Sequence, residues 1–558
     1  LESGAEYIPI DPEFPPERGA RPSERRPALP EFREPRAPVL PPLPMLPPVM
    51  ERPSAGLTIA VREIRLQGNR VFSDADLAPL LAEYEDREVA AEDLLELRDR
   101  ITRRYVEAGY INSGAVIPDQ DVRDGIVTID IVEGELDEVR ITGAEILREG
   151  FLEGRIRASA EPVLNVDRLQ EELQRLLAEP TVDRLDARLG PGAERGRSRL
   201  EVDVDEVRRF TSALQFDNDR SPSVGELQGE VEVVARSVLG FNDPAFARFD
   251  VTDGLRDIAF GYNVPLTTND LRLRVFSEYV DADVVEEPFD QLDIESESYT
   301  LEIGLRQPLI RELNNQFSLG VDFVRRHSRT TLLGDPFPIA RDGESDITAL
   351  RFIADGLARS RNDVVALRST LSVGLDTLGA TGGAPGFDDD GQFVAWLAQG
   401  QYARRFTERG DEVILRADVQ LAADPLLPLE QIAIGGLDSV RGYRRSALVR
   451  DNGVVASIEG RFPLFDLPIP ELTRPTDDPV VRLAPFADVG HGWNSGDRGP
   501  PGRASETISS IGIGALWNPS SRLAISFYYG YAFDDLTRSA DDSLQDQGIH
   551  FQIQVIPF

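Results

Sequence analysis

The sequence predicts a mainly β protein: a C-terminal transmembrane antiparallel β-barrel of about 16 strands, preceded by two small α/β domains. Two observations predict it. Apolar and polar residues alternate with period two after residue 208, and helix and strand patterns mix between residues 57 and 207. A soluble sandwich would show the same alternation, so periodicity alone leaves that architecture open. The predicted divisions are a proline-rich segment and linker (1–56), a first α/β domain (57–135), a second (136–207) and the barrel (208–558).

Composition narrows the function classes. The 558 residues carry 97 Asp and Glu against 60 Lys and Arg, a formal net charge of −37, which argues against nucleic acid as a partner. The absence of cysteine excludes disulfides, Cys-bound metal and a thiol nucleophile. No run of 18 apolar residues occurs, so no transmembrane helix is predicted. We expect no metal site and no cofactor, because the three histidines lie far apart; they are His327, His491 and His550.

Residues 1–56 hold 15 of the 40 prolines. Pairs such as Pro41-Pro42 and Pro47-Pro48 exclude a helix and favour an extended polyproline conformation. The plain interpretation is a semi-rigid linker. Two sharper interpretations stay open: a ligand for an aromatic groove of a partner, or a segment that threads a pore.

Residues 57–135 show the order strand, helix, helix, strand, strand. A first strand around residues 59–64 ends at a turn at Gly68, and Ser73 is a good N-cap for a short helix. Strand signals follow over residues 115–117 and 126–131. Between them and the short helix, apolar residues at helical spacing predict a longer helix that ends at Gly109; these residues are Leu94, Leu97, Ile101 and Tyr105.

Residues 136–207 repeat this plan more loosely, as a tandem unit. A strand is expected around Val139 and Ile141, and Asn165 can cap a helix that Pro180 ends. Two more strands are expected near residues 185–189 and 200–204. Leucines at i, i+4, i+7 and i+8 mark the buried face of the helix; they are Leu169, Leu173, Leu176 and Leu177.

Three features of residues 208–558 favour a membrane barrel over a sandwich. The alternating runs approach the length of about 9–11 residues with which a tilted strand crosses a bilayer. The polar faces carry many Arg, Glu and Asp residues, which suits a wet lumen. Aromatic residues such as Tyr528, Tyr529 and Tyr531 gather near predicted strand ends, as girdles at the membrane interface do.

Residues 434–464 carry four motifs in order: GG, SVRGY, DNG and RFPL. This string closely resembles the sixth extracellular loop and the following strand of two-partner secretion transporters. These transporters form the TpsB branch of the superfamily that also contains BamA-type assembly proteins. A VRGY match alone would be a weak signal, whereas the full ordered string is specific.

Other segments agree with this family. Residues 485–490 are similar to its F-x-D-x-G strand motif, and the resemblance implies that Phe486, Asp488 and Gly490 lie on the inner wall. The two α/β units resemble tandem POTRA domains, which are periplasmic. The terminal Phe558 resembles the C-terminal barrel signal of outer-membrane proteins, although Pro557 interrupts the last strand. Many members carry an N-terminal plug helix, and four prolines argue against a long helix here; they are Pro9, Pro12, Pro15 and Pro16.

The resemblance implies a loop site in the lumen, formed by Val440, Arg441, Gly442 and Tyr443. We hypothesise that the loop folds inward and that Arg441 makes a forked bond to Asp488, which positions the loop. The alternative is that Arg441 is one solvated arginine of the lumen among many. Tyr443 either stacks near the loop base or is a plain interface aromatic.

The resemblance also implies a function. The protein would lie in the outer membrane of a Gram-negative bacterium and export an unfolded TpsA-type exoprotein, an adhesin, cytolysin or toxin, without ATP. Its POTRA domains would accept the client by β-augmentation, near helix 94–108 or at an edge formed by strand 126–131. Outer-membrane lipid, periplasmic chaperones and the barrel assembly machinery are further expected partners.

Two rival functions stay open. The nearest is a general factor for barrel assembly and insertion, and the second is a passive porin or surface adhesin. We expect no enzymatic activity, because the sequence contains neither a GxSxG nucleophile motif nor a P-loop.

Overall fold

The chain divides into two compact units, residues 36–207 and residues 208–558 together with 1–35. The mainly β class is confirmed, with a closed barrel in one unit and α/β domains in the other. None of the described helices is long and apolar enough to cross a membrane. The computed structural model describes residues 21–27, 29, 32, 38–41, 58–122, 124–337, 341–382, 390–495, 505–534, 536 and 543–557.

The first α/β domain is built on a three-stranded sheet of order β2-β5-β4. Helix α2 buries the apolar face that the spacing predicts, including Leu97 and Ile101. Ser73 caps α1 through a capping box with Asp76, as the sequence predicts. The elements are β1 (Thr58–Val61), β2 (Glu63–Gln67), α1 (Asp74–Leu81), β3 (Arg87–Ala90), α2 (Ala91–Glu107), β4 (Gly114–Val116) and β5 (Ile126–Val132).

Three details of this domain differ from the predictions. The strand expected over residues 59–64 is split into β1 and β2, because the N–H groups of Arg62 and Glu63 both donate to the carbonyl of Gly125. β1 pairs with β3, a pairing that the sequence pattern did not predict. The expected strand edge also differs, because β5 has β2 and β4 on its two sides, and the apolar face of α2 is buried.

The second α/β domain has the sheet order β6-β8-β7. Helix α4 begins at its Asn165 cap and buries its leucine face, as predicted. Helix α3 was not predicted, because its buried face includes a charged residue that interrupts the apolar pattern. This residue is Arg155, whose Nε donates to Glu172 of α4 at 2.7 Å. The elements are β6 (Glu135–Thr142), α3 (Glu149–Ala160), α4 (Val166–Leu177), β7 (Val182–Pro191) and β8 (Arg197–Glu206).

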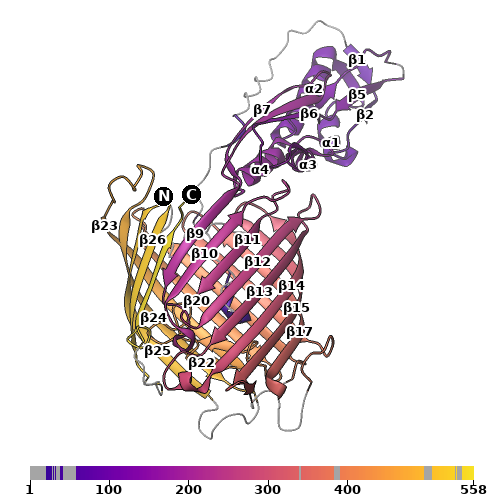
Figure 1. Cartoon of the computed structure of the whole chain (residues 1–558). Helices are drawn as coiled ribbons and strands as arrows, with labels where there is room; N and C mark the ends of the chain where they lie inside the picture. The colour runs from indigo at the N-terminus through magenta and orange to yellow at the C-terminus, as the bar shows by residue number, and fades with distance from the viewer. Residues whose placement is uncertain are drawn as a thin grey trace. The chain divides into compact units, whose positions relative to one another are not determined.

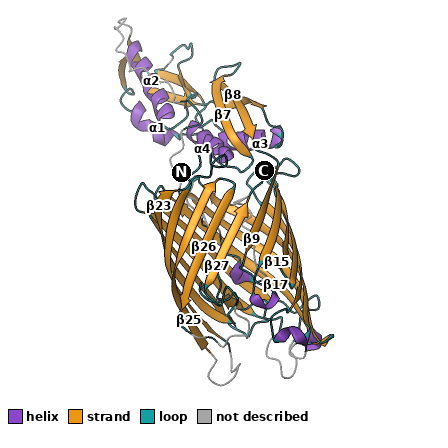
Figure 2. Ribbon diagram, turned by 60° about the vertical axis from the view of Figure 1, so that its left-hand side comes forward, coloured by secondary structure: helices purple, strands orange, loops and turns teal. Residues whose placement is uncertain are grey.

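The barrel has 16 long antiparallel strands in the described part of the chain, and β27 returns to pair with β9 (Figures 1 and 2). The two-residue strand β16 pairs with β15, which also pairs directly with β17. The strands are β9 (Phe210–Asp217), β10 (Gln228–Ala235), β11 (Ala245–Val251), β12 (Leu255–Pro265), β13 (Arg272–Asp283), β14 (Ile294–Arg311), β15 (Asn315–Leu332), β16 (Asp335–Pro336), β17 (Glu344–Arg359), β18 (Asp363–Gly374), β19 (Val394–Arg405), β20 (Glu412–Ala422), β23 (Asn452–Asp466), β24 (Val480–Trp493), β25 (Ser505–Ser520), β26 (Leu523–Ala532) and β27 (Ile549–Val555).

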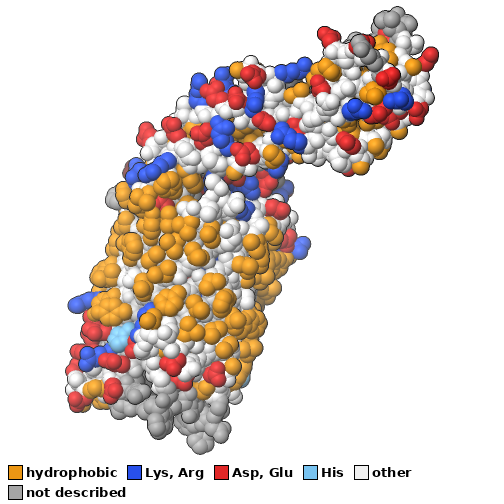
Figure 3. All heavy atoms as spheres, turned by 90° about the vertical axis from the view of Figure 1, so that its right-hand side faces the viewer, with side chains coloured by type: hydrophobic (Ala, Val, Ile, Leu, Met, Phe, Trp, Pro, Cys, Tyr) orange, Lys and Arg blue, Asp and Glu red, His pale blue; other side chains and the backbone are white. Residues whose placement is uncertain are grey.

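The outer face of the barrel is apolar, as the alternation predicts for a transmembrane wall. Ile258 and Phe260 are about half exposed, and Figure 3 shows hydrophobic side chains gathered over this wall. One aromatic assignment is wrong. Tyr528 has 0% of its surface exposed, because its parity in β26 turns it inward while Tyr529 and Tyr531 face outward.

Two segments enter the lumen. One is the connection between β20 and β23, which contains a small ribbon of β21 (Ile432–Ile434) paired with β22 (Leu448–Arg450). The other is residues 21–27, which include the 3-10 turn η1 (Pro22–Glu24) and appear as an indigo piece inside the barrel in Figure 1. Three further short 3-10 turns follow in the described residues: η2 (Pro222–Val224), η3 (Phe289–Leu292) and η4 (Arg341–Gly343).

Candidate functional site

The β20–β23 connection folds back into the barrel because its apolar residues form a small core with the wall. Ile434, Val440 and Tyr443 of the loop pack with Val455 of β23 and Ile508 of β25. The β21–β22 ribbon forms the stalk of the loop, and residues 435–447 form its tip. This apolar packing positions the tip against the wall, in addition to the charged contacts described next.

Arg441 is the centre of the site, and the structure places it against Asp488 of β24. Its Nε and Nη2 each donate to one carboxylate oxygen of Asp488 at 2.9 Å, and its backbone N–H donates to Oδ2 at 3.0 Å. Its Nη1 forms an ion pair with Glu459 of β23, and Nη2 also donates to Ser457 Oγ at 3.1 Å. Arg441 is 1% exposed. A planar guanidinium held by this many acceptors fixes the loop tip in one orientation.

Charges of opposite sign alternate around Arg441. Glu459 also accepts a hydrogen bond from Arg461 Nε at 2.7 Å. Arg461 Nη1 also lies 3.8 Å from Glu412 of β20. Carboxylates and arginines therefore alternate along one chain, in the order Asp488, Arg441, Glu459, Arg461, Glu412. Such pairing matters because a buried charge without a partner carries a large desolvation penalty.

Two aromatic rings cover the guanidinium. Arg441 Cζ lies 3.7 Å from the ring centroid of Phe486 and 5.0 Å from that of Tyr528, within cation–π range. The two rings meet edge to face with centroids 5.9 Å apart. Phe486 belongs to the predicted inner-wall motif, and here it shields the ion pair from water.

Gly442 and Gly490 are required by close approach of the backbone. Gly442 has a φ of +90°, and its N–H donates to His550 Nε2 of β27 at 3.1 Å. A Cβ at Gly490 of β24 would lie 2.4 Å from Ile434 Cγ2 and 3.0 Å from Val440 Cγ2. The loop therefore rests directly on the wall at both glycines.

Tyr443 is buried in the loop core, so it is not an exposed interface aromatic. Its hydroxyl donates to the carbonyl of Ser509 at 3.0 Å and accepts the N–H of Asp534 at 3.0 Å. These bonds connect the loop to β25 and to the chain that follows β26. Tyr443 is thus a third attachment point, beside Arg441 and Gly442.

Three contributors to the site were missed by the sequence reasoning: Glu459, Tyr528 and His550. Glu459 carried a usable signal, because it shares its strand parity with Arg461, the first residue of the RFPL motif. Tyr528 was assigned to the wrong face, and nothing local marks His550. The predicted terminal signal, Phe558, lies outside the described residues.

Residues 21–27 add a second set of luminal ion pairs. Arg25 Nη1 lies 2.6 Å from Glu302 of β14, and its guanidinium lies 5.0 Å from the ring of Phe276. Arg26 pairs with Asp418 of β20 and donates to the carbonyl of Asp438 at 2.7 Å. Because Asp438 belongs to the loop tip, the segment contacts both the wall and the loop. Of the three interpretations of the proline-rich stretch, these residues fit the segment that enters a pore.

The arrangement is suited to positioning the loop. The charged groups described above are paired with each other, and aromatic rings and apolar side chains surround them. Within the described ranges, no group of three or more His, Asp or Glu residues is placed to hold a metal ion.

Known proteins that are similar to this chain include outer-membrane transporters. The family model described as haemolysin secretion/activation protein ShlB/FhaC/HecB matches residues 196–515, more than half of the chain, and the ShlB-type POTRA domain matches residues 59–134. The outer membrane transporter CdiB of Dickeya dadantii is 22% identical over 432 residues, which is 74% of either chain. The heme/hemopexin transporter protein HuxB of Haemophilus influenzae strain 86-028NP is 21% identical over 494 residues, 85% of this chain and 83% of its own.

A solved structure shares the fold. CdiB from Escherichia coli superposes with a TM-score of 0.67 at 21% sequence identity, and the match covers 93% of this chain and 94% of that one. The likeness therefore extends over the barrel and the α/β domains.

Proposed function

Since this chain belongs to the family of haemolysin secretion/activation proteins ShlB, FhaC and HecB, which are two-partner secretion transporters, we propose that it exports one unfolded TpsA-type exoprotein through its barrel. The protein is located in the outer membrane, with its POTRA domains in the periplasm. Its client is an adhesin, a cytolysin or a toxin.

The observation that carries this proposal is the occupied lumen. The tip around Arg441 and residues 21–27 both lie inside the closed barrel and are held by buried ion pairs. A passive porin needs a continuous water-filled channel, and a surface adhesin needs no luminal segments. A lumen filled by two separable segments favours a conduit that opens when a client arrives.

The POTRA domains support capture of an extended client strand. β7 has ten residues and pairs with β8 alone in its described sheet. The free edge of such a strand offers backbone donors and acceptors with few side-chain demands, which suits an unfolded client. We therefore place capture on β7, in place of the positions on α2 and β5 that the sequence suggested.

Export in this scheme uses no ATP. Folding of the client outside the cell makes its passage directional, and no nucleotide motif is present in the sequence. Insertion of the barrel itself would need periplasmic chaperones and the barrel assembly machinery, and its apolar outer face would contact outer-membrane lipid.

The test is deletion of the gene in its host, followed by mass spectrometry of the outer-membrane and secreted proteins. We expect one large exoprotein to disappear from the surface and medium while other barrels stay unchanged, and the intact gene to restore it. A broad fall in many barrel proteins would instead identify an assembly factor. No change in either fraction would favour the porin or adhesin.

A second assay tests the energy source. The purified protein is placed in lipid vesicles with the unfolded client on the POTRA side and no nucleotide. We expect the client to become protected from protease on the other side. A strict requirement for added ATP would overturn this part of the proposal.

A further inference from the structure

The barrel closes at a short junction. β9 has 8 residues and β27 has 7, whereas β14 and β15 have 18 each. The ladder between β27 and β9 joins residues 552–555 to residues 214–217. Asn218 extends it with its side chain: Nδ2 donates to the carbonyl of Ile549 at 2.9 Å, and Oδ1 accepts the N–H of Phe551 at 2.8 Å. We call this junction, formed by β9, Asn218 and β27, the seam.

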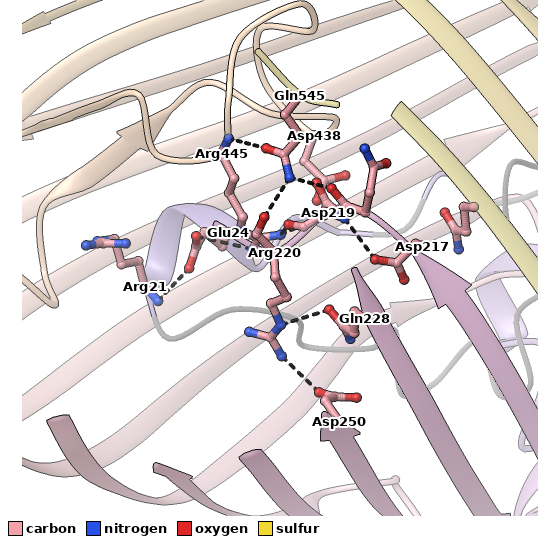
Figure 4. Close-up of polar contacts among 12 residues, drawn as sticks. Arg21, Glu24, Asp217, Asp219, Arg220, Gln228, Asp250, Asp438, Arg445 and Gln545 are labelled. Carbon is pink, nitrogen blue, oxygen red and sulfur yellow. Dashed lines mark hydrogen bonds and ion pairs between the residues drawn. The ribbon is translucent and has the colours of Figure 1, made fainter. Parts of the chain in front are cut away.

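Arg445 lies where the two sides of the seam meet (Figure 4). Its Nη1 forms an ion pair with Asp219 at 2.6 Å and donates to the carbonyl of Asp219 at 2.9 Å, just after β9. Its backbone N–H donates to Gln545 Oε1 at 2.7 Å, just before β27. Gln545 Nε2 in turn donates to the carbonyls of Asn218 and Arg220. One loop residue therefore joins the first and last strands of the barrel.

Arg444 acts beside it on the β27 side. It pairs with Asp546, which precedes β27, and its Nη1 lies 2.9 Å from Glu286, in the connection between β13 and β14. The two arginines follow directly after the Arg441–Tyr443 attachment points. The loop is itself anchored to β23 and β24, and through these two arginines it holds the seam in place.

Arg445 also holds the N-terminal segment. Its Nη2 lies 3.2 Å from Glu24 of η1, and both residues are 13% exposed at the side chain. Figure 4 shows Glu24, Asp219 and Gln545 converging on Arg445 from three separate segments. The guanidinium is therefore shared between the seam and residues 21–27. Loss of one partner changes the strength of the bonds to the other partners.

We propose that Arg444 and Arg445 clamp the seam, and that Arg445 couples the seam to the N-terminal segment. When residues 21–27 leave the lumen, Arg445 loses Glu24 and the clamp weakens, so the barrel widens between β9 and β27. The two arginines are positioning residues, because they act through the strands. The inference concerns how the barrel opens and holds for any client that the proposed function allows.

The test measures ion conductance of the full-length protein in planar lipid bilayers. Arg445→Ala removes the side-chain bonds to Asp219 and Glu24, and it should raise the fraction of time spent open at least about tenfold, the effect of losing even one charge-assisted hydrogen bond. Arg450→Ala is the matched control, because Arg450 lies in the same loop but pairs with Glu506 at 3.1 Å, away from the seam, and it should change nothing. Heat-dependent mobility on gels verifies that each barrel is folded. If Arg445→Ala does not fold, Asp219→Asn removes the same ion pair.

A disulfide across the seam tests whether Arg445 keeps the channel closed by holding the seam or only by holding the N-terminal segment. The chain has no cysteine, and Gln215 lies directly opposite Gln554 in the β9–β27 ladder. Oxidising Gln215→Cys with Gln554→Cys in the Arg445→Ala background should return the channel to the closed level, and a reductant should reopen it. A channel that stays open after oxidation would overturn the clamp.

Glu24→Gln gives the complementary comparison. It removes the contact with the N-terminal segment and leaves the bonds of Arg445 to Asp219 and Gln545. We expect a smaller rise in open time than for Arg445→Ala. Equal rises would also overturn the clamp, since they would mean that Arg445 acts through Glu24 alone. The deletion experiment above is independent of both results, so failure of the clamp and failure of the export proposal are distinguishable.

Discussion

At the residue scale, the molecule depends on an arginine that is removed from water and fully paired. Arg441 meets Asp488 in a forked geometry and Glu459 through a third nitrogen, under the ring of Phe486. A buried ion pair of this kind adds little net stability, but it penalises every arrangement in which one partner is missing. The pair therefore selects one position of the loop.

Arg441→Ala should undock the loop while the barrel stays folded. It leaves Asp488 and Glu459 buried beside a missing partner, at a cost of about 3–5 kcal/mol to the docked state. We expect the loop to become sensitive to protease and export of the client to fall sharply, as measured by blotting of the culture medium. Arg450→Ala is the control. Intact export in a stably inserted Arg441→Ala barrel would contradict the role assigned to Arg441.

Gly490→Ala tests the close approach of loop and wall without touching a charge. The added methyl group would lie 2.4 Å from Ile434 Cγ2, and overpacking of this kind costs about 1–3 kcal/mol. We expect the same protease sensitivity as for Arg441→Ala, in weaker form. Gly356→Ala in β17 is the matched control, because a Cβ there meets nothing within 4 Å. Equal behaviour of the two alanine variants would sink the packing argument.

At the element scale, the predictable parts are those in which one periodicity matches one environment. Helix α4 was predicted because its leucines follow the helical repeat, and β26 because its outward residues alternate. Helix α3 was not, because Arg155 lies on its buried face and breaks the apolar stripe. The Arg441–Asp488 pair came from a motif. The strand parity of Glu459 gives only its face, and its contact with Arg441 needed the register of β23 against its neighbours, which sequence spacing does not contain.

Glu172→Ala should destabilise the second α/β domain strongly. Glu172 accepts hydrogen bonds from Arg155 Nε at 2.7 Å and Arg175 Nε at 2.9 Å, and Arg155 is buried. Removing it leaves Arg155 paired with Glu179 at 2.7 Å, so the expected cost is that of a buried donor left unpaired, about 1–3 kcal/mol. The neighbouring Glu171→Ala removes a more exposed pair with Arg175 and should cost at most about 0.5 kcal/mol. Denaturant unfolding of both variants measures the difference, and similar values would contradict the buried-pair account.

At the scale of the whole molecule, the barrel is filled by parts of its own chain. The loop tip and residues 21–27 take up the polar positions that water or a client would otherwise occupy. Each is attached through side chains, with the backbone ladder of the wall left intact, so each can leave without unfolding a strand. The wall of such a barrel can stay folded when the loop tip or residues 21–27 move.

Arg25→Ala with Arg26→Ala should release the N-terminal segment. The change removes the ion pairs with Glu302 of β14 and Asp418 of β20, which hold the segment to two separate strands of the wall. We expect higher conductance in planar bilayers and an unchanged folded mobility on gels. The matched variant, Arg25→Lys with Arg26→Lys, retains the charges and should stay nearer to the closed level. Unchanged conductance in the alanine variant would show that the charges do not hold the segment.

The unequal height of the wall bears on the lipid around it. β9 and β27, with 8 and 7 residues, fall short of the length of about 9–11 residues that spans the hydrocarbon core, whereas β14 exceeds it with 18. A bilayer that surrounds such a rim must thin on the short side, at a small cost for each ångström of hydrophobic mismatch. Longer acyl chains would raise that elastic strain beside β9 and β27, and shorter chains would relieve it. Membrane thickness would therefore act on one side of this barrel more than on the other.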